Sequence, residues 1–164
     1  MGCGSERVLI DAGDHGRPDY LDLLGRTLQT LCGGARLSSI LVTHSHPDHI
    51  GGVRDVIRRF GAAGGCVVRK VPWHGRDMGL QIAQVVDGDV LRVDARTTLH
   101  ALHTPGHAPD HVCWLLEEAR CLFSGDNVLG AGTVIIPRDG GDMEQYLRSL
   151  ARLAELDADT IHPG

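Results

Sequence analysis

Aromatic side chains are scarce in this sequence, which holds two Trp, two Tyr and two Phe in 164 residues. Its core must therefore consist mainly of aliphatic residues, and an apolar share of 42% is enough to form one. No apolar run approaches the roughly 18 residues that a membrane-spanning helix needs, so we expect no membrane contact. There is no excess of basic residues either, since the formal net charge is −5, which argues against a broad nucleic-acid surface.

Cysteine pairs with metal or redox spacing are also missing. The five cysteines form no C-x-x-C pair and their number is odd, which favours reduced, mostly buried thiols in an intracellular protein. The start, MGCGSERVLIDAG, has neither the apolar stretch of a signal peptide nor an Arg-rich helix. A myristoylation motif at Gly2 fails because Glu6 replaces the required Ser or Thr. We therefore predict no targeting segment in this chain.

The mixture of helical and strand patterns predicts a layered α/β protein with one domain over residues 1–164. Leucines at helical spacing follow Pro18 and stop before Gly33, which predicts a first helix. A second helix is predicted from residue 50 to Gly61, and a third after Asp142, with Gln145 completing a capping box. Strands are predicted at residues 6–11, 38–43, 66–71, 97–103, 111–116 and 120–123 and from residue 160. A hairpin-type turn is predicted at Asp87 and Gly88 within residues 85–93.

The stretch LVTHSHPDHIGG, residues 41–52, packs three histidines and an aspartate into six residues at the end of an apolar run. Period-two geometry places His44 and His46 on one face of the strand end, and Pro47 ends that strand. Asp48 and His49 follow in the turn where the next helix begins. Imidazole and carboxylate groups suit zinc, and unpaired polar groups crowded beside a core are costly. The pattern predicts part of a metal site rather than a solvated turn.

Two segments downstream carry further candidate ligands. His107 in HTPGHAPDH follows a predicted strand, and Asp126 in LFSGDNVLG follows another. Taken alone, a histidine in a Pro-Gly turn is more often a surface residue, and an aspartate after Ser-Gly is more often a turn former. Together with the first cluster, however, all candidates lie at strand ends, where open α/β sheets tend to place their sites.

These motifs resemble those of the metallo-β-lactamase-fold hydrolases: THSHPDH matches their H-x-H-x-D-H motif, TPGH their next histidine and SGD their bridging aspartate. LIDAG, residues 9–13, is similar to their first motif. The resemblance implies an αββα sandwich and two zinc ions, with a water ionised near neutral pH as the nucleophile. It implies a first ion on His44, His46 and His107, a second on Asp48, His49 and Asp126 with Asp126 bridging, a catalytic role for Asp48 in orienting the hydroxide, and support of the site by Asp11.

Finer features, TPGHAPDH, FSGDNVLGAGT and DADTIHPG, resemble a branch of mitochondrial endoribonucleases. This likeness implies a phosphodiester hydrolase that cuts single-stranded RNA in the mitochondrial matrix, with the cytoplasm as the alternative location. His111 would lie near the leaving group or be a packed strand-edge histidine, while Trp73 and His74 would line the mouth of the site or belong to an ordinary loop. Three other functions fit the same motifs: a thioesterase of the glyoxalase II type, an iron persulfide dioxygenase and a non-catalytic remnant.

The chain departs from the family pattern at both ends, which predicts a fragment. The family's last zinc histidine lies in a PGHG segment, whereas this sequence stops at IHPG with Gly164. His162 stands where the family has no ligand, so we expect it not to bind metal. The sandwich is also expected to lack an N-terminal β-hairpin and a C-terminal region, which would leave an open sheet edge. We therefore expect the isolated chain to bind about one zinc tightly and to hydrolyse its substrate poorly.

Overall fold

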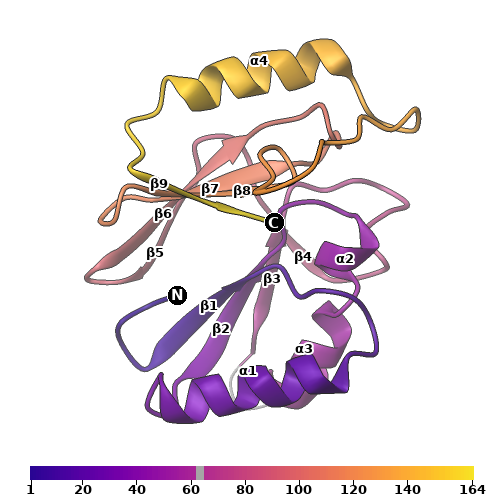
Figure 1. Cartoon of the computed structure of the whole chain (residues 1–164). Helices are drawn as coiled ribbons and strands as arrows, with labels where there is room; N and C mark the ends of the chain where they lie inside the picture. The colour runs from indigo at the N-terminus through magenta and orange to yellow at the C-terminus, as the bar shows by residue number, and fades with distance from the viewer. Residues whose placement is uncertain (62–64) are drawn as a thin grey trace.

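The computed structural model describes residues 1–61 and 65–164, which form two β-sheets packed face to face. Helices cover the outer face of each sheet (Figure 1), so the predicted αββα sandwich is confirmed. The strands are β1 (Glu6–Ile10), β2 (Arg36–Leu41), β3 (Val67–Lys70), β4 (Ile82–Gln84), β5 (Val90–Asp94), β6 (Thr97–His103), β7 (Val112–Leu116), β8 (Cys121–Gly125) and β9 (Thr160–Pro163). The helices are α1 (Pro18–Thr30), α2 (Pro47–Ile50), α3 (Val53–Phe60) and α4 (Met143–Ala154).

The first sheet is parallel and has the order β1-β2-β3-β4. Successive residues of a strand face opposite sides of a sheet, and β2 shows this clearly. Ile40 packs in the cluster beneath α1 and α3, whereas Leu41 packs against the second sheet, and both are fully buried. Burying a side chain of this size contributes roughly 1.5–3 kcal/mol. The strand that leads into the candidate metal ligands is therefore held firmly on both faces.

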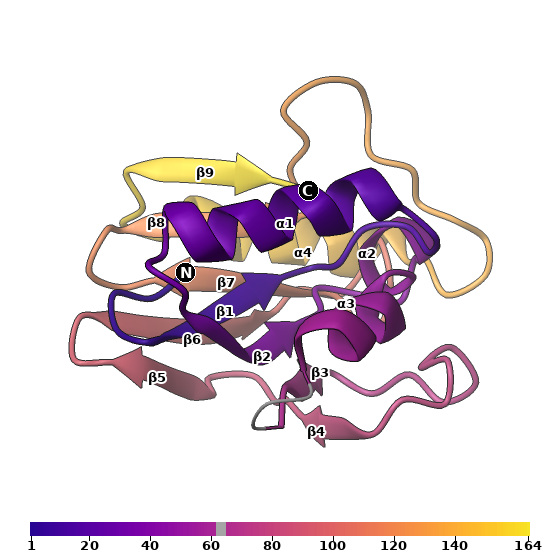
Figure 2. The same cartoon turned by 90° about the horizontal axis from the view of Figure 1, so that it is seen from below.

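The second sheet has the order β5-β6-β7-β8-β9, with β5 and β9 at opposite edges (Figure 2). Neighbours from β5 to β8 are antiparallel, and β9 runs parallel to β8. On the inner face Trp114 packs in the same cluster as Leu41 of the first sheet. On the outer face Leu122 packs against Leu153 of α4. The core therefore lies in three layers, one between the sheets and one under each helical face.

The predicted turn at Asp87 and Gly88 is present, but the strands on its two sides do not pair as a hairpin. β4 belongs to the first sheet and β5 to the second, so the turn carries the chain from one sheet to the other. The Asp89 carboxylate accepts a hydrogen bond from the Val86 N–H (2.9 Å), which closes the turn locally. Asp-Gly favours a tight turn in either setting, and it does not determine whether the flanking strands pair.

The predicted second helix is divided at Gly51 and Gly52 into α2 and α3. A Cβ at Gly52 would lie 2.1 Å from the carbonyl oxygen of Ala12, so no side chain fits there. The Gly52 N–H donates to the Gly13 carbonyl at 2.7 Å, and the Ala12 N–H donates to the His49 carbonyl at 2.8 Å. The LIDAG segment therefore docks directly on the turn that carries the candidate ligands.

The third helix begins as predicted. The Gln145 N–H donates to the Asp142 carboxylate at 2.9 Å, and the Gln145 side chain donates to the same carboxylate at 3.1 Å rather than reaching the Asp142 backbone. Within residues 1–61 and 65–164, no helix is long and apolar enough to cross a membrane.

β1 is an edge strand of the first sheet, and its outer edge is partly covered. β1 pairs with β2 on one side. On its other side, Val8 exchanges two backbone hydrogen bonds with Met1, at 2.5 and 2.8 Å.

Candidate metal centre

Three imidazole nitrogens converge beyond the end of β2. His44 Nε2 lies 2.9 Å from His46 Nδ1 and 3.2 Å from His107 Nε2, and His107 Nε2 lies 2.9 Å from His46 Nδ1. His44 and His107 are buried, and His46 is half-buried. Donors this close together can all point at one ion. These three residues are called the histidine half of the site below.

Asp48, His49 and Asp126 form a second group, called the carboxylate half below. His49 Nε2 lies 3.1 Å from Asp126 Oδ1 and 3.7 Å from Asp48 Oδ2. The other oxygen of Asp126, Oδ2, faces the histidine half, 3.6 Å from His107 Nε2 and 3.9 Å from His44 Nε2. The structure therefore brings all six predicted ligands together and places one carboxylate between the two halves.

Two glycines allow the loops that carry His107 and Asp126 to approach closely. Gly106 has φ 134°, and a Cβ there would lie 2.2 Å from the backbone nitrogen of Tyr146 in α4. Gly125 has φ 48°, and a Cβ there would lie 2.7 Å from His111 Nε2. Both positions favour glycine by their backbone conformation and exclude a side chain by contact. The glycines of TPGH and SGD thus have a packing role beside the site.

Asp11 orients the His49 ring directly and the His44 ring through Thr43, which is the supporting position that the resemblance implies. Its Oδ2 accepts hydrogen bonds from His49 Nδ1 (2.7 Å) and from Thr43 Oγ1 (2.8 Å), and its Oδ1 accepts one from the Thr43 N–H (2.8 Å). Thr43 Oγ1 in turn lies 3.0 Å from His44 Nδ1. Because the Nδ1 atoms of His44 and His49 are occupied, their Nε2 atoms are left to face the site.

The third ring with a fixed orientation is His107. Its Nδ1–H donates to the carbonyl of Ile135 at 2.7 Å, so Nε2 keeps the lone pair that faces the other histidines. Sequence reasoning did not find this contact, because a backbone carbonyl leaves no residue signal. Thr43, Ser45 and Asp110 were missed as well, although each lies inside or beside a motif that was recognised.

The two halves differ in protonation. Burial lowers the pKa of His44, with the neighbouring histidines adding to the effect, and burial also lowers the pKa of His46. Burial acts in the same direction on His49, but its bonds to the Asp11 and Asp126 carboxylates outweigh burial and raise its pKa to about 10. Burial raises the pKa of Asp126, but the bond from His49 outweighs it and lowers that pKa overall. In the metal-free chain, therefore, burial favours the neutral form of His44 and His46, whereas the carboxylate half holds a proton on His49.

His111 is fully buried, which favours a packed histidine over a contact near the leaving group. The Asp126 N–H donates to His111 Nε2 at 3.2 Å, and His111 Nδ1 lies 3.0 Å from Thr104 Oγ1. Burial lowers the pKa of His111 to about 3, so the ring is neutral and can accept this bond. His111 positions the backbone of the bridging aspartate from inside the protein.

Trp73 borders a groove of about 620 Å³ that also contacts Ser45 and His46. The Arg76 guanidinium lies 5.3 Å from the centre of the Trp73 ring. His74 is exposed, and among the described residues it lines neither this groove nor the cleft at Asp48. Trp73 therefore remains a candidate for substrate contact, whereas His74 has no comparable position.

A cleft of about 260 Å³ opens over both halves of the site. Its lining includes His46, His107, Asp48 and Asp126. The remainder of the wall comes from one segment after β8, namely Leu129, Thr133, Val134, Ile135 and Pro137. One side of the cleft is thus metal-ligating and the other is mostly apolar.

His162, which we expected not to bind metal, is exposed and stacks on Phe123 with ring centroids 5.2 Å apart. It belongs to neither group of potential ligands within the described part of the chain. Gly164 lies closer to the site, because a Cβ there would be 2.9 Å from Asp126 Oδ1 and 3.0 Å from a carbon of the His49 ring. β9 therefore ends beside the carboxylate half.

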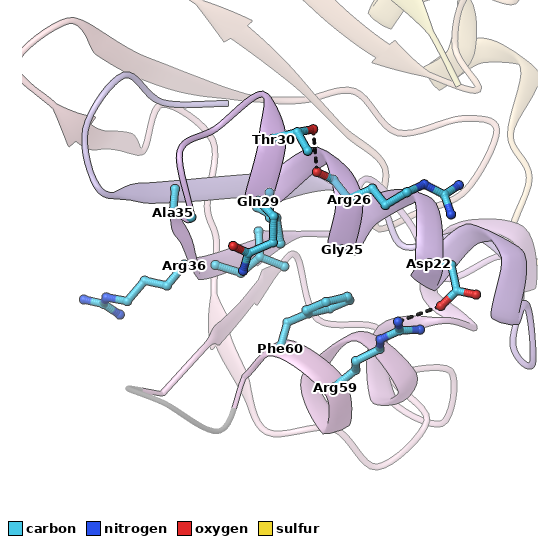
Figure 3. Close-up of a pocket in the computed structure, with 12 residues that line it drawn as sticks. Asp22, Gly25, Arg26, Gln29, Thr30, Ala35, Arg36, Arg59 and Phe60 are labelled. Carbon is cyan, nitrogen blue, oxygen red and sulfur yellow. Dashed lines mark hydrogen bonds and ion pairs between the residues drawn. The ribbon is translucent and has the colours of Figure 1, made fainter.

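A separate hollow of about 620 Å³ lies between α1 and α3 (Figure 3). Its lining includes Phe60, whose ring is in contact range of Gly25, and Arg59, which pairs with Asp22 at 2.6 Å. It contains none of the six candidate ligands. This hollow is the junction of two helices and is separate from the metal centre.

The sequence pattern of the Metallo-beta-lactamase superfamily matches residues 4–164, and the chain belongs to this superfamily. It is 37% identical over 164 residues to lactamase-like protein aptB of Emericella nidulans, covering all of this chain and 48% of aptB. It is 43% identical over 134 residues to atrochrysone carboxyl ACP thioesterase dmxR1 of Cryptosporiopsis sp., covering 81% of this chain and 38% of that protein. The chain thus spans about half or less of the length of these relatives.

Solved structures agree with the fold. The structure of TTHA1623 in a di-iron-bound form matches with a TM-score of 0.75 and 30% identity, over 96% of this chain and 80% of that one. The structure of ETHE1 from Myxococcus xanthus matches with a TM-score of 0.75 and 27% identity, over 100% of this chain and 66% of that one.

The donor set of this chain fits a divalent metal. Imidazole rings with fixed tautomers and a carboxylate shared between two positions are the groups that such ions bind. The cluster is therefore a metal-binding centre of His and Asp residues. The same nitrogen and oxygen donors accept zinc and iron, so the donors alone do not select the ion.

Proposed function

We propose that this chain carries the metal site of a thioester hydrolase, with zinc as the metal. The observation that carries the proposal is the 43% identity to an ACP thioesterase over 81% of the chain. The converging ligands supply the means, and the apolar wall of the cleft suits an acyl group. The finer sequence motifs favour RNA hydrolysis over thioester hydrolysis, and this proposal reverses that order.

The chemistry divides between the metal and the chain. When bound, a pair of divalent ions lowers the pKa of a water and polarises a carbonyl oxygen. Asp48, whose side chain is 63% exposed and lines the cleft, would orient the attacking water by accepting its hydrogen bond. Asp126 would hold the two ion positions at a fixed separation, and His111 would hold Asp126. The apolar segment around Val134 would keep bulk water away from the acyl carbon.

The leaving group also favours a thioester. A free thiol has a pKa of about 8.5, so a thiolate leaves without a strong general acid. The oxygen expelled from RNA is far more basic and would benefit from an acid. His111, the residue expected near the leaving group, is buried with a pKa of about 3 and cannot supply that proton.

Hydrolysis of single-stranded RNA is the weaker proposal. The net charge is −5, and among the described residues the cleft at Asp48 is lined by no Lys or Arg that could pair with phosphates. The names of the relatives reported above do not mention RNA. RNA as a partner and the mitochondrial location therefore remain predictions from sequence motifs.

The test compares substrates on the chain loaded with Zn²⁺. Thiol release from an acyl N-acetylcysteamine thioester and cleavage of a labelled single-stranded RNA are measured under the same conditions. We expect the chain to release thiol, and we expect this activity to be lost on chelation and in Asp48→Asn. Asp157→Asn, a matched change at an exposed aspartate, should keep the activity. Cleavage of RNA with no turnover of the thioester would reverse the proposal. Oxygen uptake by the iron-loaded chain would instead support the dioxygenase alternative.

A further inference from the structure

The sequence contains one lysine, Lys70, and its other 15 basic residues are all arginines. Lys70 is the last residue of β3, and its side chain is fully buried. Taking an ammonium group out of water is costly unless good partners surround it. The chain's one lysine is thus placed where its charge has no access to solvent.

The Lys70 ammonium has three partners, which matches its three N–H donors. Nζ lies 2.5 Å from Asp110 Oδ2, 2.8 Å from Asp77 Oδ1 and 2.7 Å from the carbonyl oxygen of Val71. Asp110 is 1% exposed, so this ion pair is shielded from solvent. These contacts lie behind the metal centre and include none of its six candidate ligands.

The Asp110 contact leads to the histidine half. Ser45 Oγ donates to Asp110 Oδ2 at 2.6 Å, and Ser45 stands between His44 and His46 in the chain. Asp110 itself follows His107 by three residues in the same loop. One buried carboxylate therefore joins the two segments that supply the three imidazoles.

The Asp77 contact leads to the groove. Asp77 accepts hydrogen bonds from the Trp73 N–H with its two oxygens at 3.0 and 3.1 Å, which closes the loop over residues 73–77. Trp73 and Arg76 of this loop line the groove beside His46. The two carboxylate partners of the ammonium, Asp77 and Asp110, thus each contact a segment that borders the metal centre.

We propose that Lys70 is a positioning residue that fixes the histidine half through Asp110 and Ser45, and the groove loop through Asp77. An uncharged side chain at this position would leave two carboxylates without their cation, one of them fully buried. The contribution to the groove rests on the proposed function. The contribution to metal binding does not, and it can be measured without a substrate.

The first test removes the link to the histidine half while leaving the buried ion pair in place. In Ser45→Ala we expect the affinity of the tight site for Zn²⁺ to fall by up to about tenfold, the lower end of the range for a direct partner of a metal ligand, because the Ser45 hydroxyl acts on the ligands through Asp110 and the backbone. Affinity is read by competition with a chromogenic chelator. Ser45→Thr, which keeps the hydroxyl, should restore most of the affinity. Ser39→Ala, a buried serine earlier on β2, is the matched control and should bind as the unchanged chain does.

The second test loosens the link to the groove. Asp77→Asn should raise KM for the thioester with kcat and Zn²⁺ affinity unchanged, because the loop lines the groove and supplies no ligand. Asp157→Asn is the control at an exposed ion pair. If no thioester is turned over, the proposed function fails, while the Zn²⁺ measurement on Ser45→Ala still tests the link through Ser45 on which the role of Lys70 at the metal depends.

Lys70 also provides its own check on folding, because it is the one ε-amine of the chain. Its acylation by an N-hydroxysuccinimide ester, read from the peptide mass, should be slow in the folded chain and in each variant above. Equal Zn²⁺ affinity in Ser45→Ala and Ser39→Ala, with Lys70 protected in both, would overturn the proposal. Rapid acylation of Lys70 in the unchanged folded chain would overturn it as well.

Discussion

The histidine half and the carboxylate half of the metal centre differ in burial and in charge. The histidine half is largely buried, and burial lowers the pKa of His44 and His46. Its rings are oriented by groups such as Thr43 and the Ile135 carbonyl. The carboxylate half includes Asp48, which is mostly exposed, and His49, which keeps a proton between two carboxylates. An ion entering the first half meets free lone pairs, whereas an ion entering the second must displace that proton. The comparison predicts two metal positions of unequal affinity.

This difference also indicates different roles for the two halves. The buried half is suited to holding an ion permanently, because its donors are preorganised. The exposed half faces the cleft, where water and substrate arrive.

Asp126→Asn should have the largest effect, because Asp126 is the one group among the described residues that belongs to both clusters of candidate ligands. The change keeps the shape and removes the charge. We expect both metal positions to weaken and thioester turnover to fall by at least about 100-fold, beyond the usual loss from an outer partner. Zn²⁺ titration and thiol release measure the two effects. A loss confined to one position would show that Asp126 does not bridge.

Removing one ligand from each half should separate the positions. His107→Ala is expected to abolish tight binding, because one of three converging nitrogens is lost. His49→Ala is expected to leave one tightly held ion per chain. Metal content after gel filtration gives the comparison. If both variants retained the same amount of metal, the two halves would be equivalent.

The pH dependence of binding should differ between the halves. His49 has a pKa of about 10, so it is protonated at neutral pH and must release a proton to bind an ion. Affinity at the carboxylate half should therefore fall as pH falls, by about tenfold per pH unit for one displaced proton. The lowered pKa values of His44 and His46 predict a flatter dependence for the histidine half. Chelator competition between about pH 6 and 8 would show parallel curves if this account were wrong.

The orienting contacts should act on one half at a time. Thr43→Val removes the hydroxyl beside His44 Nδ1, and we expect the tight position to weaken roughly tenfold, at the lower end for such partners. Asp11→Asn weakens the bond to His49 Nδ1 and should act mainly on the second position. Separate titrations of the two variants test this. Identical losses of affinity at both positions in the two variants would show that Thr43 and Asp11 orient both halves together.

The smallest effect is expected far from the metal. Asp142→Ala removes the cap of α4 and should lower the free energy of unfolding by about 1 kcal/mol. Both metal affinities should be unchanged, because α4 supplies no ligand. Urea unfolding in the presence of chelator measures the stability, and a change in Zn²⁺ affinity would contradict the separation of cap and site.

The ligand set was predictable from the sequence because its spacing is local. His44 and His46 lie two apart at a strand end, Pro47 fixes the start of α2, and Gly106 and Gly125 mark the loops that bring in the remaining ligands. The αββα layers followed from the same motifs. Short-range geometry and a recognisable family pattern carried these predictions.

The parts that were missed depend on long-range contacts. The turn at Asp87 has hairpin chemistry, and only the pairing of distant strands shows that it joins two sheets. His111 resembles a residue of the site by its motif, yet the packing of Gly125 and Asp126 turns it inward. The pairing of Lys70 with Asp110 joins residues 40 positions apart, which no local pattern indicates.

An equilibrium titration of the metal-free chain with Zn²⁺ against a competing chelator measures whether the two metal positions differ in affinity. We expect one tight position, assigned to the histidine half by its loss in His107→Ala, and a second, weaker position whose affinity falls as pH falls. Two positions of equal affinity, or a tight position that survives in His107→Ala, would contradict it.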